Sequence, residues 1–296
     1  MIATEYLNSV LAAQNLSDES AEMTELQKHR AEVEGLLREA FGAASPTIRY
    51  GGSKAKGTLI RESYDLDLVC YFPSGENGAG ATLKEIFENV GASLAEHYSV
   101  SPKTSALRLH SSDMAHRDFH IDVVPGRFTD DSKSDSFLFQ NGGDKERLKT
   151  NLQVHIDLIR DAGVTPALRL LKLWRVRQGL PLKNFVWELL CIRLLQAVKT
   201  KPLDQQITHV LGSVADADRA IPVEDPANPQ GNDLMPVLND LWGWLRAAAG
   251  QTLQTVAVSG WEGVFGQVEV IDQIERTSRL ATAASAVVSP TKPWAG

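Results

Sequence analysis

The feature that most constrains this chain is a pair of aspartates at the start of an apolar segment. Asp65-Leu66-Asp67 opens a stretch in which apolar residues hold every second position, namely Leu66, Leu68, Cys70 and Phe72. This alternation predicts a strand with one buried face and both carboxylates on the other face. Side chains two residues apart on a strand lie about 6.5 to 7 Å apart, so two carboxylates can converge on divalent ions. Aspartate is disfavoured in strands, which favours a functional pair over two solvated side chains.

A glycine-containing segment precedes the pair. Tyr50-Gly51-Gly52-Ser53 follows a short extended stretch at 47–50, and Gly57-Thr58 follows a brief helical or turn segment. Glycines let backbone N–H groups approach a polyanion, and the Ser53 hydroxyl can donate to a phosphate oxygen. Together with Asp-x-Asp, this order predicts a phosphate cradle that leads to a metal site.

A third carboxylate is expected on a later strand. In residues 118–124 polar and apolar residues alternate, which predicts a half-buried strand with Asp118, His120 and Asp122 on one face. Asp122 is the predicted third carboxylate, as bridging ligand or general base. Asp118 and His120 are the alternatives, although magnesium prefers oxygen ligands to imidazole.

These motifs resemble the polymerase-β-like nucleotidyltransferase superfamily, in which Gly-Ser, a spacer, Asp-x-Asp and a later Asp form the active site. Within it, the chain looks most like the cGAS/DncV-like and oligoadenylate-synthetase-like enzymes, with the archaeal CCA-adding enzymes a close second. The matching parts lie between about residues 45 and 245 and are 52–67, 120–125, 170–174, 181–190 and 224–229.

The resemblance implies an α+β fold with a nucleotidyltransferase sheet lobe packed against a helical lobe, preceded by N-terminal helices. We expect an N-terminal helical region at 1–45, the catalytic core at 46–145, the helical lobe at 146–280 and a flexible tail at 281–296. Periodicity predicts strands at 47–51, 65–72, 104–110, 118–124 and 136–140. It predicts helices from a cap at Ser17 to Phe41 and at 81–98, 144–161, 165–178, 184–199, 204–219, 232–249 and 262–279.

The resemblance also implies roles for single residues. Asp65, Asp67 and Asp122 would hold two Mg²⁺ ions, with Mn²⁺ as a substitute, and Gly52 and Ser53 would bind the nucleotide. Lys172 corresponds to a helix lysine that contacts the triphosphate. Asn184 stands where related enzymes commonly carry a serine, and its amide can still donate.

Charge is distributed unevenly along the chain. The 296 residues carry a formal net charge of −7, which argues against extensive nucleic-acid binding. Residues 166–201 nevertheless hold eight basic residues and one acidic residue, Glu188. Arg169, Lys172 and Arg175 recur every three residues, and we expect this stripe to face the cleft while Leu168, Leu171 and Trp174 pack in the core. This local excess suits ATP and other nucleoside triphosphates; a solvated basic face is the alternative.

No segment resembles a membrane span or a signal peptide, so a cytoplasmic protein without a membrane partner is expected. Two cysteines, Cys70 and Cys191, lie in apolar segments and suit buried thiols.

The function that these features favour is synthesis of a cyclic di- or trinucleotide second messenger from nucleoside triphosphates, with release of pyrophosphate, in bacterial anti-phage signalling (CBASS). The alternative is a template-independent transferase that adds nucleotides to RNA, as CCA-adding or oligoadenylate-synthesising enzymes do, or to a small molecule. A catalytically silent binding subunit is disfavoured because all three carboxylates are present.

The last residues suggest a further partner. The chain ends in Trp294-Ala295-Gly296 within a tail rich in Ala, Ser, Thr and Pro. A terminal glycine has no Cβ to hinder activation of its carboxyl group. Some enzymes of the resembled family are conjugated through such ends by ubiquitin-activating-like partners, which makes Gly296 a candidate. A frayed terminus, or a tail whose Trp294 docks on the body, is the alternative.

Overall fold

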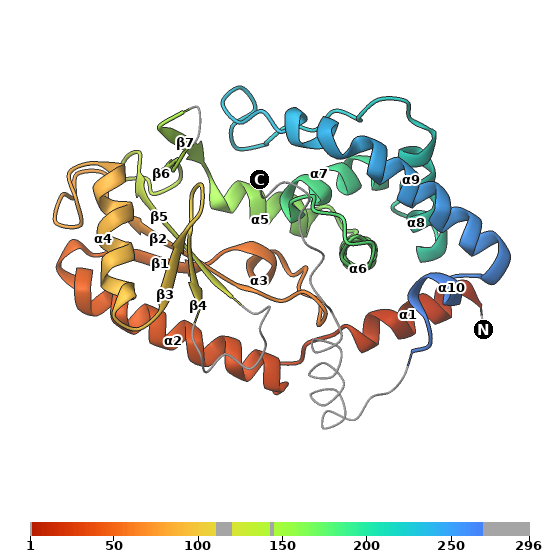
Figure 1. The fold of residues 1–296 in the computed structure, drawn as a ribbon, viewed down its shortest axis with the longest axis horizontal. Helices are drawn as coiled ribbons and strands as arrows, with labels where there is room; N and C mark the ends of the chain where they lie inside the picture. The colour runs from red at the N-terminus through yellow and green to blue at the C-terminus, as the bar shows by residue number, and fades with distance from the viewer. Residues whose placement is uncertain (1, 111–119, 143–144, 269–296) are drawn as a thin grey trace, which may run out of the picture.

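The computed structural model describes residues 2–110, 120–142 and 145–268. Figure 1 shows a sheet part and a helical part side by side, with a short helix between them. The sheet part contains α2 (Ala21–Phe41), η1 (Gly42–Ala44), β1 (Thr47–Tyr50), α3 (Gly52–Lys56), β2 (Leu66–Phe72), α4 (Leu83–Ala95), β3 (Ser99–Pro102), β4 (Leu107–His110), β5 (Ile121–Phe128), β6 (Ser136–Phe139) and β7 (Arg147–Thr150). The helical part contains α1 (Ala3–Ala13), α5 (Leu152–Asp161), α6 (Thr165–Arg177), α7 (Asn184–Leu195), α8 (Leu203–Asp216), α9 (Met235–Ser259) and α10 (Glu262–Phe265).

The seven strands form one mixed sheet. Its main path is β1-β2-β5-β4-β3, and β6 and β7 extend from β5. Strands β2 and β5 are parallel, whereas the other pairs are antiparallel. The parallel pair places Asp67 opposite Asp122, so two carboxylates from distant parts of the chain lie side by side.

Helices α2 and α4 cover one face of the sheet. Their apolar residues, among them Leu26, Leu37 and Ile86, pack on Leu66 and Leu68 of β2 in one buried core. On the opposite face of β2, Val69 and Tyr71 pack against Phe128 and Leu138. The strand is therefore buried on both faces beyond Asp67, whereas the pattern of apolar residues predicts one buried face.

A second core lies among the helices. It is built around α6 and α7, where Trp174 and Trp187 are almost fully buried with ring centroids 5.6 Å apart. Leu168 and Leu171 are buried with them, as predicted. Helix α1 adds Tyr6 and Leu7 to this core, while α2 belongs to the sheet core. The N-terminal helices thus connect the two cores.

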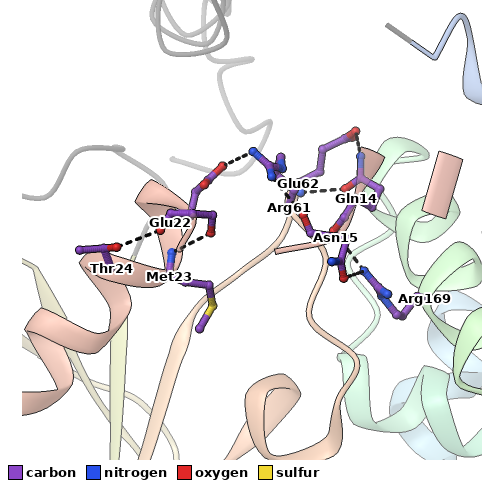
Figure 2. Close-up of polar contacts among 9 residues, drawn as sticks. Gln14, Asn15, Glu22, Met23, Thr24, Arg61, Glu62 and Arg169 are labelled. Atoms are coloured by element: carbon purple, nitrogen blue, oxygen red, sulfur yellow. Dashed lines mark hydrogen bonds and ion pairs between the residues drawn. The ribbon is translucent and has the colours of Figure 1, made fainter. Parts of the chain in front are cut away.

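The turn between α1 and α2 is fastened to the loop that leads into β2 (Figure 2). Gln14 donates from Nε2 to Glu62 at 2.7 Å, and its side-chain oxygen accepts from the Glu62 backbone at 3.1 Å. Arg61 donates to Glu22 at 2.8 Å. Arg169 of α6 donates to the backbone oxygen of Gln14 at 3.2 Å. These contacts hold the loop just before Asp65 from two sides.

The predicted α+β fold is confirmed, and several element bounds are corrected. Helix α2 is capped by Ser20, whose hydroxyl accepts from the Met23 backbone at 3.2 Å, so Ser17 is not its cap. The prediction of a helix at 144–161 is wrong for the first part of that range. Residues 147–150 pair with β6 as strand β7, and Asn151 then caps α5 by accepting from the backbone of Val154.

Other differences concern where elements end. Strand β3 at 99–102 was not expected, and β5 runs on to Phe128 through Pro125. Helix α7 ends at Leu195, α9 extends to Ser259, and α10 stops at Phe265 before Gly266, whose φ is +70°. Asp118 and the tail with Trp294 and Gly296 lie outside the described residues. The proposed boundaries at 45, 145 and 280 remain predictions.

Both cysteines, Cys70 and Cys191, are buried and free, as predicted. In the described part of the chain, no helix combines the length and the apolar character needed to cross a membrane.

Candidate active site

The site is built on a row of residues that begins just after β1 and crosses β2, β5 and β4. Gly51, which directly follows β1, donates its N–H to the backbone oxygen of Asp67 at 2.8 Å. Asp67 on β2 is paired with Asp122 on β5, and Asp122 is paired with Arg108 on β4. Residues in register on neighbouring strands project to the same face. Asp67, Asp122 and Arg108 therefore point out of the sheet together.

Asp65 joins this row through His120. The Leu66 N–H donates to the His120 oxygen at 3.2 Å, which fixes the two entering strands against each other. Nδ1 of His120 lies 3.3 Å from Oδ1 of Asp65, and its Nε2 lies 3.6 Å from Oδ2 of Asp122. One imidazole thus lies between two carboxylates, and the structure brings Asp65, Asp67 and Asp122 to one place.

Gly52 makes room for Asp67. It has a φ of +47°, in the left-handed region, and begins α3. A Cβ on Gly52 would lie 1.6 Å from Oδ2 of Asp67, a separation that no two such atoms can adopt. Glycine is therefore required here both by its backbone angle and by the close approach of the carboxylate. The Gly-Ser segment and the Asp-x-Asp segment are therefore packed directly against each other.

The carboxylates repel one another. Burial, followed by repulsion from Asp65 and Asp122, raises the pKa of Asp67 to about 6. Burial also raises the pKa of Asp65, with Asp122 adding to the effect while His120 and Lys172 oppose it. Among the described residues, no side chain or backbone group donates a hydrogen bond to the Asp67 carboxylate. A positive charge placed between these groups would relieve the repulsion.

Lys172 of α6 reaches the Gly-Ser segment from the helical part. It is 2% exposed, and its Nζ donates to Oγ of Ser53 at 2.8 Å and to the backbone oxygen of Ser63 at 3.2 Å. Burial lowers the pKa of Lys172 to about 8 and is the main cause of the shift. The nearby charge of Lys56 also lowers this pKa. A buried cation thus lies against the serine that is predicted to hold phosphate.

A second buried network lies beside Lys172. Glu188 of α7 is 2% exposed and pairs with the ammonium group of Lys56, and its other oxygen accepts from Oγ1 of Thr58 at 2.7 Å. Lys56 and Thr58 flank Gly57, at the end of α3. Glu188 therefore fixes the far end of the short helix whose first turn carries Ser53.

The predicted basic stripe does not face the carboxylates as a whole. Arg169 donates to the backbone oxygens of Leu59 and Gln14, at 3.1 and 3.2 Å. Arg175 donates to the backbone oxygen of Leu182 at 2.6 Å and to Oδ1 of Asn184 at 2.6 Å. Only Lys172 of the three contacts the Gly-Ser segment, because residues three apart on a helix drift around its axis. The Asn184 oxygen is thus engaged, which leaves its amide N–H groups as donors.

Neither Arg108 nor Glu188 was singled out as a site residue from the sequence. Arg108 alternates with Leu107 and Leu109, so a strand with a polar face was predictable. Its partner was not, because the register between β4 and β5 depends on contacts distant in sequence. One feature of the sequence could have identified Glu188, since it is the single acidic residue in the basic segment 166–201.

The donor set fits a hard divalent cation. In the described part of the chain, no three acidic, His or Cys side chains are already placed around one metal position. Asp122 is engaged by Arg108, through Nε to Oδ1 at 2.9 Å and Nη2 to Oδ2 at 2.8 Å. Three converging carboxylates nevertheless supply the oxygen ligands that Mg²⁺ and Mn²⁺ prefer, and their mutual repulsion is what such an ion neutralises.

Solved structures share this architecture. No protein-family model matches the chain, and no curated protein sequence matches it. CdnC of Escherichia coli MS115-1, solved with ATP, has a TM-score of 0.68 and 18% identity over 90% of this chain and 98% of its own. The CD-NTase CdnG of Bradyrhizobium diazoefficiens, solved with GTP, has a TM-score of 0.66 and 12% identity over 93% and 97%. This chain has the fold of a CD-NTase.

A third neighbour of the same CD-NTase fold is DncV of Vibrio cholerae in its 3′-deoxy GTP-bound form. Its TM-score is 0.59, with 17% identity over 92% of this chain and 85% of its own. The shared fold agrees with the resemblance drawn from the Gly-Ser and Asp-x-Asp motifs.

Replacing Gly52 tests the geometry of the site. We expect Gly52→Ala to lower the free energy of unfolding by about 1–3 kcal/mol, because it forces a left-handed alanine and displaces the Asp67 carboxylate. The matched control is Gly51→Ala, whose Cβ would meet nothing nearer than 3.6 Å. Urea unfolding measures both. Equal midpoints for Gly52→Ala and Gly51→Ala would show that the close approach is absent.

Proposed function

We propose that this protein is a metal-dependent nucleotidyltransferase that joins nucleoside triphosphates into a cyclic di- or trinucleotide and releases pyrophosphate. The observation that carries the proposal is the convergence of Asp65, Asp67 and Asp122 beside Ser53 and the buried Lys172. Carboxylates for a cation and a lysine for a polyanion, held next to each other, suit a substrate that contains both metal-binding and free phosphate oxygens.

The proposed division of labour follows from position. Asp65 and Asp67 hold the ions that accompany the triphosphate, and Asp122, on the neighbouring strand, serves the side where the attacking hydroxyl arrives. Two Mg²⁺ ions, when bound, stabilise the entering and leaving oxygens at the α-phosphorus. Ser53 and Lys172 bind the triphosphate tail, and the amide of Asn184 donates to the same tail.

Burial strengthens the attraction between Lys172 and a phosphate group. An ammonium group that has lost most of its hydration gains more from a phosphate oxygen than a solvated one does. Lys172 donates to Ser53, so the nucleotide meets a donor pair that is already oriented. Glu188, by holding Lys56 and Thr58, keeps α3 from shifting when the phosphates arrive.

The product class is supported by the neighbours. Several solved structures of this fold are named as cyclic dinucleotide synthases, among them CdnE of Elizabethkingia meningoseptica. We propose the same class of product for this chain, and with it a role in CBASS anti-phage signalling. Its net charge of −7 favours free nucleotides over a long nucleic acid as the acceptor.

Incubation with labelled ATP, GTP, CTP and UTP and Mg²⁺ or Mn²⁺ tests the proposal. We expect phosphatase-resistant products in the absence of RNA, because a cyclic product has no terminal phosphate. Asp67→Asn should reduce the rate by at least about 100-fold while leaving the unfolding free energy unchanged or higher, since it removes repulsion rather than a bond. Asp240→Asn, the same change at an exposed position of α9, is the control.

Two results would contradict the proposal. Incorporation that occurs only when tRNA or another RNA is supplied would assign the chain to the RNA-modifying alternative. Full activity of Asp67→Asn would remove the carboxylates from the mechanism.

A pH titration of nucleotide binding tests the role of Lys172. Its pKa of about 8 means that it is charged below pH 8 and loses its proton above it. The affinity for ATP should therefore fall as the pH rises from 7 to 9, with proton uptake on binding above pH 8. Lys172→Ala should bind more weakly, raise KM more than it lowers kcat, and lose this pH dependence. Calorimetry measures the Kd, and Lys199→Ala, which removes an exposed lysine, is the control. If Lys172→Ala kept the wild-type pH dependence of ATP binding, the contact between Lys172 and the triphosphate would be refuted.

A further inference from the structure

Arg108 makes the most specific contact in the carboxylate cluster. It projects from β4 directly opposite Asp122 and donates to both carboxylate oxygens, at 2.9 and 2.8 Å. This parallel two-bond arrangement fixes the plane of the carboxylate as well as its position. The pKa of Arg108 is raised, and the main cause is its hydrogen bond to Asp122.

In the described part of the chain, the other carboxylates of the cluster have no such arginine partner. Asp65 has His120 beside it, and Lys56 and Lys172 donate to Glu188 and Ser53 rather than to the cluster. Among the described residues, Arg108 is thus the one permanently charged side chain that is hydrogen-bonded to the cluster. Its charge partly offsets three carboxylates that otherwise repel one another.

We infer that Arg108 is a positioning residue that acts as the counter-cation of Asp122 and limits how tightly the cluster binds a divalent cation. Each carboxylate oxygen has a second lone pair, so Asp122 can keep Arg108 and still offer a ligand. A divalent ion that binds there is repelled by the guanidinium. Arg108 therefore orients Asp122 while weakening metal binding. This inference rests on the proposed metal-dependent function.

Metal affinity measured without turnover tests the inference. Mn²⁺ binding is followed by electron paramagnetic resonance on the wild type, Arg108→Met, Arg108→Lys and the control Lys201→Met, which removes one charge from an exposed position. We expect Arg108→Met to bind Mn²⁺ at least tenfold more tightly than the wild type. Arg108→Lys keeps the charge but loses the two parallel hydrogen bonds, so it should bind Mn²⁺ more weakly than Arg108→Met does. Lys201→Met should remain within about threefold of the wild type.

Thermal unfolding in EDTA supplies a second measurement. Arg108→Met should unfold at a lower temperature than the wild type without metal, and Mn²⁺ should raise its midpoint by more than it raises that of the wild type. Mn²⁺ binding by Arg108→Met that is unchanged or weaker overturns the inference alone and leaves the proposed function standing. A wild type that binds no Mn²⁺ overturns both.

Discussion

Repulsion between carboxylates on two parallel strands is the constraint on which the site depends. Strands β2 and β5 place Asp67 and Asp122 next to each other, and Asp65 adds a third negative charge. Folding places positive charge near them, on Arg108 and, farther away, on Lys172. Keeping these carboxylates together costs stability, and ionisable groups with shifted pKa values of this kind cluster at functional sites.

The helical part completes the site through buried polar contacts. Lys172 and Glu188 cross from α6 and α7 to Ser53, Lys56 and Thr58. Buried ion pairs contribute little net stability, because desolvation offsets their attraction, but removing one partner leaves an unpaired charge. These contacts therefore serve mainly to fix α3 relative to both cores. The contacts of Arg61 and Arg169 around Gln14 restrain the loop that leads into Asp65 in a similar way.

Local patterns predicted much of this arrangement, and nonlocal contacts explain the differences. The alternation around Asp67 and Asp122 correctly predicted strands for these two carboxylates, whereas Asp65 lies directly before β2. The glycine in the predicted cradle is Gly52, which has a left-handed backbone. Arg108 was missed because strand register is set by tertiary pairing. Residues 147–150 carry a pattern compatible with a helix but pair with β6 instead. Arg169 and Arg175 satisfy backbone oxygens, a demand that sequence does not reveal.

A crystal structure with Mg²⁺ and a non-hydrolysable ATP analogue tests the account most directly. We expect the cation to be bound by Asp65 and Asp67, and the triphosphate to contact Ser53 and Lys172. Binding of the analogue away from these residues, or a triphosphate bound with no cation at the carboxylates, would contradict the account.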